Sequence, residues 1–451
     1  MSNPSPPGPR IPKLASTLWW MRAPFELLDH CAKRYGEPFS MGLVGFPKLV
    51  VTYSPEVVKE VFADDGETLA AGKFNKSLSA LLGERSILML DGAEHLRHRR
   101  LLLPPFQGER MQRYGQAMLE ATDHAIDRWS PGEVFALHPH MQDVTLRVIL
   151  RTVFGFEEGP RFDEMRRRMK LILHLGSWPP LLVPFMRVDL GPRSPWGKFR
   201  RAVESGDEYL YQAIAERRSS GARGSDVLSL LLDARDDQGR AMSDLELRDE
   251  LTTLLVAGHE TTATALAWAV RWTLGTPGMA ERLESEIRDA ARADGTSRLT
   301  AARAAELPLV DAICREALRL NPVVPLVGRV LQRPLRIAGY DLAEGTPLVC
   351  SIYLAQRRPE AYPNPTRFDP SRFLGKKPSP TEFFPFGGGV RRCIGMAFAL
   401  YEMRIVLARM LERADLRLTP RGAIAVQRRS ITLMPSDGLL VRVDRVDGAA
   451  A

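Results

Sequence analysis

The sequence predicts a mainly α-helical fold of the α+β class, in which a large helical body carries a small β-rich lobe. Apolar residues recur at spacings of three and four over most of the chain, which is typical of amphipathic helices. Short β-like runs lie near the two ends, which predicts a small sheet beside the helical body. No linker-like break interrupts the 451 residues. One domain is therefore expected over residues 1–451, with loose termini at about 1–12 and 445–451.

The same patterns predict the individual elements. Helices are expected, in chain order, at residues 25–34, 55–62, 95–103, 118–129, 140–154, 226–233, 244–275 and 396–410. Strands are expected at residues 48–53, 335–338, 347–351 and 439–443. The polar stretch 217–224 is expected to form a surface loop.

Composition limits the possible partners and surroundings. With 45% hydrophobic and 26% charged residues, the chain has no run near the ~18 apolar residues of a membrane span, and its start does not resemble a secretory signal. Its four cysteines are scattered without a Cys-x-x-Cys pair, which argues against zinc and disulfides and fits a reducing cytoplasm. The net charge of +8 comes from dispersed arginines. This pattern argues against nucleic acid and favours an acidic protein partner.

One cysteine lies in a setting that suggests chemistry. Cys393 belongs to a glycine-rich loop that leads directly into a helix. Gly387 and Gly389 allow backbone turns that a Cβ would forbid. Arg391 and the amides at the start of the helix favour a thiolate. Such a thiolate is a ligand for a soft or borderline metal, including haem iron. The alternative is a structural cysteine in a turn.

Residues 386–395 read Phe-Gly-Gly-Gly-Val-Arg-Arg-Cys-Ile-Gly. This segment resembles the haem-binding signature of the cytochrome P450 family, Phe-Gly-x-Gly-x-Arg-x-Cys-x-Gly, and the resemblance extends over about residues 7–443. It implies haem b as cofactor, Cys393 as the axial ligand of the iron, and Phe386 and Gly395 as further cofactor-binding residues. Eukaryotic members usually carry an N-terminal membrane anchor. Its absence here implies a soluble, bacterial, cytoplasmic form.

The long helix expected at residues 244–275 has an unusual centre. Ala257 and Gly258 are followed by an acid and a hydroxyl, Glu260 and Thr261, although Gly costs ~1 kcal/mol in a helix relative to Ala. A helix-packing contact beside a surface acid would explain the pattern, and so would the close approach of a flat ligand beside a proton route. A zinc-protease motif is excluded, because its second His would fall on Ala263. The segment resembles the family's oxygen-activation motif, which implies that Ala257 contacts the haem and that Glu260 and Thr261 are catalytic.

Two charged residues, Glu316 and Arg319, are three apart on one expected helix face. By themselves they could be a surface ion pair. They also match the family's Glu-x-x-Arg, and the segment around Arg372 resembles the family's second arginine segment. The resemblance implies a buried network of Glu316, Arg319 and Arg372 that holds the cysteine loop.

Haem propionates need cations or hydrogen-bond donors. His95 and Arg99 match the family's His-x-x-x-Arg, and Arg329 and Arg391 occupy its other two propionate positions, so the resemblance implies that these four residues bind the cofactor. The neighbouring charges Arg97, Arg100 and Arg392 are expected to be solvated.

Substrate contacts are expected from loops that vary in the family. These are residues 69–88, residues 171–187, the helix face near Leu255, residues 323–327 and residues 431–438. Within them, His174, Trp178, Pro179, Pro180 and Pro184 belong either to a core helix hairpin or to a mobile lid that could touch a membrane surface.

The resemblance implies a haem-thiolate monooxygenase. It would insert one atom of O2 into a lipophilic small molecule, such as a fatty acid, terpenoid, steroid or polyketide. Electrons would come from NAD(P)H through an acidic ferredoxin or flavodoxin, and a monomer is expected. A peroxide-driven peroxygenase, a haem-thiolate isomerase and a non-enzymatic haem sensor or carrier are the alternatives. The acid–Thr pair and the missing output domain argue against them.

Overall fold

The structure is a computed structural model that describes residues 5–176, 187–221, 224–419, 425–429 and 432–447. It is mainly helical with small sheets, as predicted. The helices are α1 (Lys13–Arg22), α2 (Pro24–Tyr35), α3 (Pro55–Ala63), α4 (Ala71–Asn75), α5 (Ser79–Leu82), α6 (Gly92–Leu102), α7 (Glu109–Ile126), α8 (Leu137–Phe154), α9 (Pro160–Gly176), α10 (Pro195–Ser220), α11 (Val227–Asp233), α12 (Asp244–Gly275), α13 (Met279–Ala293), α14 (Ala301–Glu306), α15 (Pro308–Leu320), α16 (Ile352–Ala355) and α17 (Met396–Arg413). The strands are β1 (Phe39–Gly42), β2 (Lys48–Thr52), β3 (Leu69–Ala70), β4 (Val134–Ala136), β5 (Leu326–Leu331), β6 (Leu335–Ile337), β7 (Tyr340–Leu342), β8 (Pro347–Ser351), β9 (Ala414–Leu418), β10 (Val426–Arg429), β11 (Thr432–Pro435) and β12 (Leu440–Val446).

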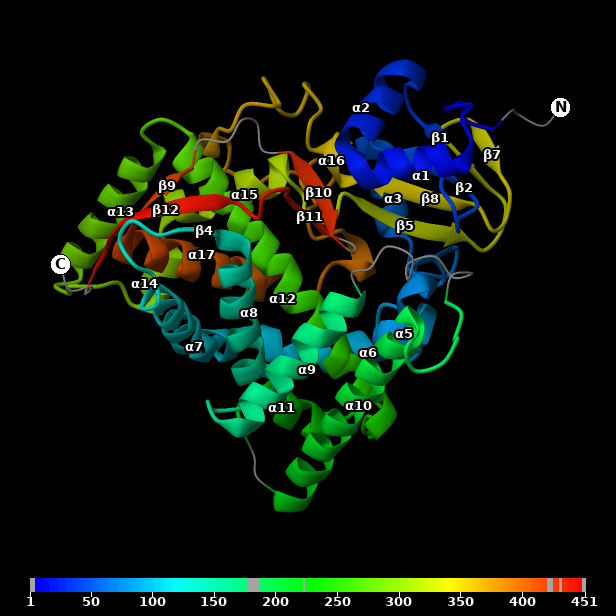
Figure 1. Ribbon diagram of the computed structural model, residues 1–451. Helices are drawn as coiled ribbons and strands as arrows, with labels where there is room; N and C mark the ends of the chain where they lie inside the picture. The colour runs from blue at the N-terminus through cyan, green and yellow to red at the C-terminus, as the bar shows by residue number, and fades with distance from the viewer. Residues whose placement is uncertain (1–4, 177–186, 222–223, 420–424, 430–431, 448–451) are drawn as a thin grey trace.

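The largest sheet has the strand order β1-β2-β8-β5-β3 and lies beside α1 and α2, on the opposite side of the molecule from α13 and α14 (Figure 1). Its central strands alternate between two apolar cores. Val50 and Leu348 pack into one core, while Val51 and Val349 pack into the other. This period of two is what a strand buried on both faces requires. The sheet thus forms the β-rich lobe that the sequence predicted.

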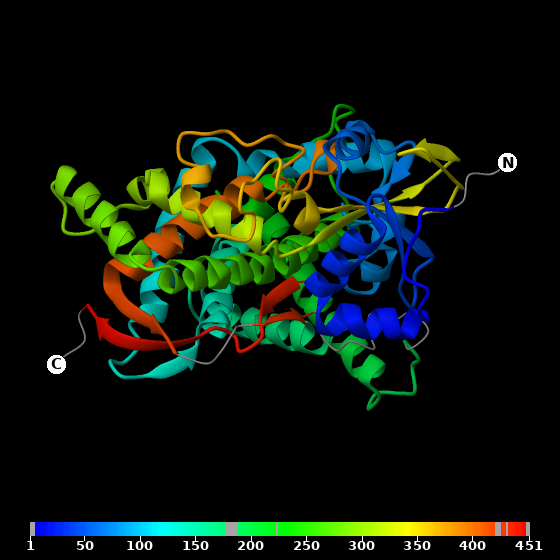
Figure 2. The same ribbon diagram turned by 90° about the horizontal axis from the view of Figure 1, so that it is seen from above.

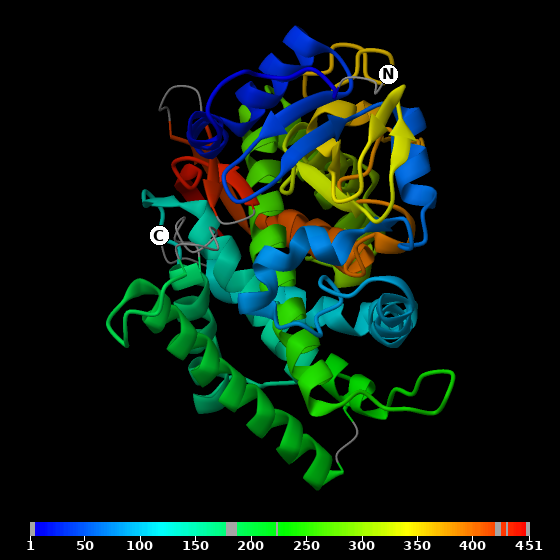
Figure 3. The ribbon, with the colours of Figure 1, turned by 90° about the vertical axis from the view of Figure 1, so that its right-hand side faces the viewer.

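Helix α12 runs through the middle of the molecule (Figures 2 and 3). It begins with a capping box, in which Ser243 Oγ accepts a hydrogen bond from the Glu246 amide and the Glu246 carboxylate accepts one from the Ser243 amide. Its 32 residues are the ones expected, and it packs against α8, α15 and α17. Because neighbours surround it, α12 is apolar on several faces.

Some predicted boundaries were wrong. Helices α7 and α8 start earlier than expected, and α10 continues to Ser220, so residues 217–220 are helical and not loop. Ordered contacts also lie within both of the expected terminal segments. The carbonyl of Pro7 accepts a hydrogen bond from the Ser40 amide at 2.6 Å, and β12 extends to the buried Val446. Within the described ranges, no helix combines the length and apolar character that crossing a membrane would require.

Candidate functional site

The cysteine loop is shaped by its glycines and by α3. Gly387 and Gly389 have φ angles of 67° and 62°, as their predicted role in turns requires. A Cβ on Gly389 would come within 2.0 Å of the carbonyl oxygen of Phe62. The Cys393 amide donates to the carbonyl of Phe386 at 2.9 Å, which closes the loop just before α17. These contacts fix the position of the cysteine.

The thiol of Cys393 is subject to opposing influences. The residue is exposed, yet desolvation by the surrounding protein raises the pKa of its thiol. The Gly395 amide and the charge of Arg99 act in the opposite direction and lower this pKa. The expected effect of the helix amide is therefore present but outweighed by burial. The cysteine is thus accessible to a ligand, although its thiol is desolvated. A metal cation there would supply the charge that the thiolate needs.

Three arginines converge on a buried histidine. His95 is 2% exposed, and its Nδ1 has no hydrogen-bond partner among the described residues. Burial and, to a smaller extent, the charges of Arg391, Arg99 and Arg329 together lower the pKa of His95 to about 3. This half-buried cluster thus combines excess positive charge with an unused polar atom. A ligand with two carboxylates, such as haem with its propionates, fits it.

Local carbonyl groups hold these arginines in place. Arg99 donates to the carbonyl of Arg392 at 2.6 Å, and Arg329 donates to the carbonyl of Gly328. Arg391 donates to backbone carbonyls just before α6 and forms an ion pair with Asp91. Sequence reasoning missed Asp91, although it immediately precedes the helix that carries His95.

On α12, the small residues have different surroundings. A Cβ on Gly258 would lie 2.8 Å from Ile149 Cδ1 of α8. Helix packing therefore explains the glycine at position 258. The close approach of a flat ligand is not needed as an explanation there. Ala257 and Thr261 are half-buried, and the Thr261 hydroxyl donates to the Ala257 carbonyl at 2.5 Å.

Glu260 is not a surface acid, since its side chain is only 13% exposed. Its Oε2 accepts a hydrogen bond from the Gln142 side-chain amide, and its Oε1 lies 3.8 Å from His138 Nε2. Both partners come from α8. Sequence reasoning missed them, but a His and a Gln spaced by four in a largely apolar helix were a usable signal.

The structure brings Glu316, Arg319 and Arg372 together. Glu316 and Arg319 are fully buried and form two hydrogen bonds of 2.6 and 2.8 Å. Arg372 Nε lies 3.4 Å from the Glu316 carboxylate. Sequence reasoning missed Gln356, which donates to the Arg319 carbonyl and accepts from the Phe384 amide. Gln356 thereby connects α15 to the start of the cysteine loop.

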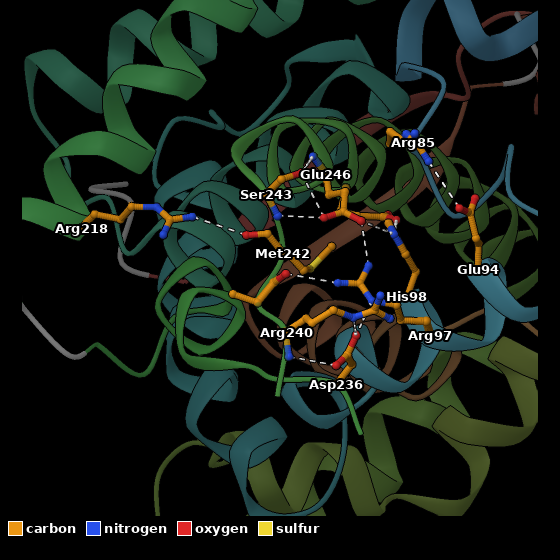
Figure 4. A network of polar contacts seen from close by, with 12 residues as sticks. Arg85, Glu94, Arg97, His98, Arg218, Asp236, Arg240, Met242, Ser243 and Glu246 are labelled. Atoms are coloured by element: carbon orange, nitrogen blue, oxygen red, sulfur yellow. Dashed lines mark hydrogen bonds and ion pairs between the residues drawn. The ribbon is translucent and has the colours of Figure 1, made fainter. Parts of the chain in front are cut away.

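The three arginines expected to be solvated differ from one another. Arg97 is 18% exposed and bonds to Asp236 and Glu246 at 2.7 Å each, so the expectation was wrong for it (Figure 4). Arg100 is 65% exposed but is paired with Asp237. Arg392 is exposed, as expected.

The expected substrate segments are only partly described. Leu255 is fully buried, and the half-buried apolar side chains beside it are Leu254 and Val256. His174 is exposed near the end of α9. Trp178, Pro179, Pro180 and Pro184 lie outside the described residues, so the choice between lid and hairpin stays open.

Comparison with known proteins identifies the family. The family model described as cytochrome P450 matches residues 5–442. Cytochrome P450 135B1 of Mycobacterium tuberculosis is 38% identical over 441 residues, covering 97% of this chain and 91% of the relative. Cytochrome P450 135A1 of the same species is 35% identical over 442 residues, covering 97% and 95%.

Solved structures agree with these relatives. A cyanobacterial CYP120A1 with bound retinoic acid superimposes with a TM-score of 0.83 at 25% identity, covering 98% of this chain and 99% of that one. The haem domain of cytochrome P450DA gives a TM-score of 0.85 at 25% identity, covering 99% and 98%. With a family match over nearly its whole length, this chain belongs to the cytochrome P450 family, and it is a haem-thiolate monooxygenase whose cofactor is protoporphyrin IX haem.

Proposed function

We propose that the chain inserts one atom of O2 into a lipophilic small molecule. The second oxygen atom leaves as water, and NAD(P)H supplies the two electrons through a separate redox protein. The observation that carries the proposal is the centre of α12. There Leu254, Val256, Ala257 and Thr261 are half-buried in a helix that is otherwise largely buried. Apolar side chains beside one hydroxyl suit an apolar substrate held at a reactive centre.

The chain's own residues then have distinct roles. The bound haem supplies the oxidising chemistry. Cys393 would hold the haem through its sulfur, with Phe386 and Gly395 shaping its loop, and the small side chain of Ala257 would leave room for the cofactor. The four residues His95, Arg99, Arg329 and Arg391 bind the propionates. Glu260 carries protons from solvent, and the Thr261 hydroxyl passes them to the reaction centre.

The substrate is proposed to be an elongated apolar molecule, such as a fatty acid, terpenoid, steroid or polyketide. The retinoic acid bound by CYP120A1 is such a molecule in a protein of the same fold. A spectral screen tests this proposal: an apolar ligand that displaces water from the iron should shift the Soret band to shorter wavelength. If no member of these classes shifts the band, the proposed substrate class is wrong.

Turnover experiments test the reaction type. Product should form with NADPH and a reductase, and much less with peroxide alone. Thr261→Ala should keep its haem but divert electrons into peroxide, because protons are no longer steered. A normal ratio of product to NADPH in this variant would place proton delivery elsewhere.

The electron donor is proposed to be an acidic protein that docks on the cysteine side, and the protein is proposed to act as a cytoplasmic monomer. All four cysteines are free thiols, which supports a reducing compartment. Arg97 and Arg100 already pair with carboxylates. The charges proposed to attract the donor are therefore Arg110 and Arg113 of α7 together with Arg392, all of which are exposed.

A further inference from the structure

A polar ladder lies between α8 and α12. His138 and Gln142 are four apart on α8, and Glu260 and Thr264 are four apart on α12, so each pair projects from one face of its helix. Gln142 Nε2 donates to Glu260 Oε2. His138 Nε2 lies 3.0 Å from Thr264 Oγ1 and 3.8 Å from Glu260 Oε1. Both carboxylate oxygens of Glu260 thus lie against α8.

Burial makes these contacts important for Glu260. His138 and Thr264 are completely buried, and the Glu260 side chain is largely shielded from solvent. An ionised carboxylate in such surroundings is costly unless hydrogen bonds stabilise it. The neutral amide of Gln142 provides one such bond to Oε2. The other oxygen, Oε1, faces His138, whose Nε2 lies 3.8 Å away.

We propose that Gln142 and His138 are positioning residues for Glu260. Gln142 fixes Oε2, and His138, held by Thr264, stands beside Oε1, where the proton is exchanged. This inference rests on the proposed proton-delivery role of Glu260 and adds two residues of α8 on which that role depends.

Infrared spectroscopy of the ferric holoenzyme tests the role of Gln142. The carboxyl band of Glu260 is followed in pH-difference spectra and assigned with Glu260→Gln. In Gln142→Leu the ionised form loses a hydrogen bond, so the midpoint of the band should move up by about one pH unit. The same variant should lower the product formed per NADPH.

A matched control comes from the same interface. The Thr145 hydroxyl of α8 donates to the carbonyl of His259 on α12 at 3.0 Å. Thr145→Val therefore removes a polar contact between the two helices but leaves both partners of Glu260 in place. Its band should stay at the wild-type midpoint. A shift equal to that of Gln142→Leu would mean that general loosening of the interface is responsible, and would overturn the inference.

His138→Phe tests the second contact. The stretching frequency of the protonated Glu260 carboxyl should change, because Oε1 loses its polar neighbour. A Glu260 band that is unmoved in both Gln142→Leu and His138→Phe contradicts the inference. If Glu260→Gln itself retains the wild-type product per NADPH, the proton-delivery proposal fails, and the band still decides whether α8 positions the carboxylate.

Discussion

At Cys393 the chain presents a thiol that it does not ionise by itself. Burial raises the pKa of this thiol more than the Gly395 amide and Arg99 lower it, so the thiolate depends on a bound cation. Cys393→Ser should therefore remove the strongly red-shifted absorption of the reduced carbon-monoxide complex, which needs a sulfur ligand. If the variant retains that absorption, Cys393 is not the axial ligand.

The Glu316–Arg319 pair allows a sharp test because the same helix carries a second pair. Arg319 is fully buried with Glu316, whereas Arg315 pairs with Asp311 at the partly exposed surface of α15. Removing one partner of a buried pair costs ~3–5 kcal/mol, while exposed pairs contribute about 0–1 kcal/mol. Arg319→Ala should give mostly insoluble or haem-free protein, and Arg315→Ala should be soluble and loaded. Equal yields and haem contents would show that the Glu316–Arg319 pair has no structural role.

Between elements, α6 and α12 are joined by a network of charges. His98 of α6 lies 2.7 Å from the Glu250 carboxylate and 3.1 Å from that of Glu246. Burial raises the pKa of Glu250 to about 7, against the effect of the His98 hydrogen bond. Burial also opposes the charge of Glu246, but hydrogen bonds from Ser243 and Arg97 outweigh it and lower the pKa of Glu246 to about 2. The pKa values of two carboxylates one helical turn apart are thus shifted in opposite directions, so their contributions to stability change with pH in opposite directions.

A raised pKa in the folded state means that folded Glu250 holds its proton more tightly than the unfolded chain does. Its ordinary pKa is about 4.3, so stability should fall as pH rises from about 4.3 to about 7. Glu250→Gln removes this penalty and can still hydrogen-bond to His98. Its melting temperature should exceed that of the wild type at pH 8 but not at pH 5, whereas Glu246→Gln should lower it at pH 8. A pH-independent difference for Glu250→Gln would show that Glu250 does not titrate in this range.

The bounds of a helix can be predicted from the sequence where its polar residues are exposed, but not where they are buried. The bounds of α12 could be predicted because a polar stretch precedes its long apolar pattern. The first turn of α8 could not, since His138 is polar yet buried against α12. At the site, the resemblance to family motifs pointed to residues such as Cys393 and Glu260. It could not predict Asp91 or Gln356, because their contacts join segments far apart in the chain.

At the scale of the whole molecule, many of the described arginines form ion pairs with nearby carboxylates. Exposed arginines without such a pair are therefore available to attract an acidic partner. Within the described ranges, no carboxylate forms an ion pair with Arg110, Arg113 or Arg392, and all three are exposed. Tyr114, at the same end of α7, contacts the ring of Phe398, five residues after Cys393. These three charges therefore lie on the cysteine side, where a short electron path requires the donor to dock.

An acidic donor would be steered to this face by long-range attraction, which salt screens over ~8–10 Å. Arg113→Glu and Arg392→Glu should slow the first electron transfer, measured by stopped-flow reduction, while haem content and substrate-induced spectral shifts stay normal. Arg336→Glu makes the same change of charge on the β6–β7 hairpin, where Arg336 is 67% exposed, and it should leave the rate unaltered. The wild-type rate should also fall as ionic strength rises, and the two slow variants should depend less on salt because part of the attraction is already lost. The donor docks elsewhere if the rate changes neither with salt nor with the two charge reversals. The same conclusion follows if Arg336→Glu lowers the rate as much as Arg113→Glu and Arg392→Glu do.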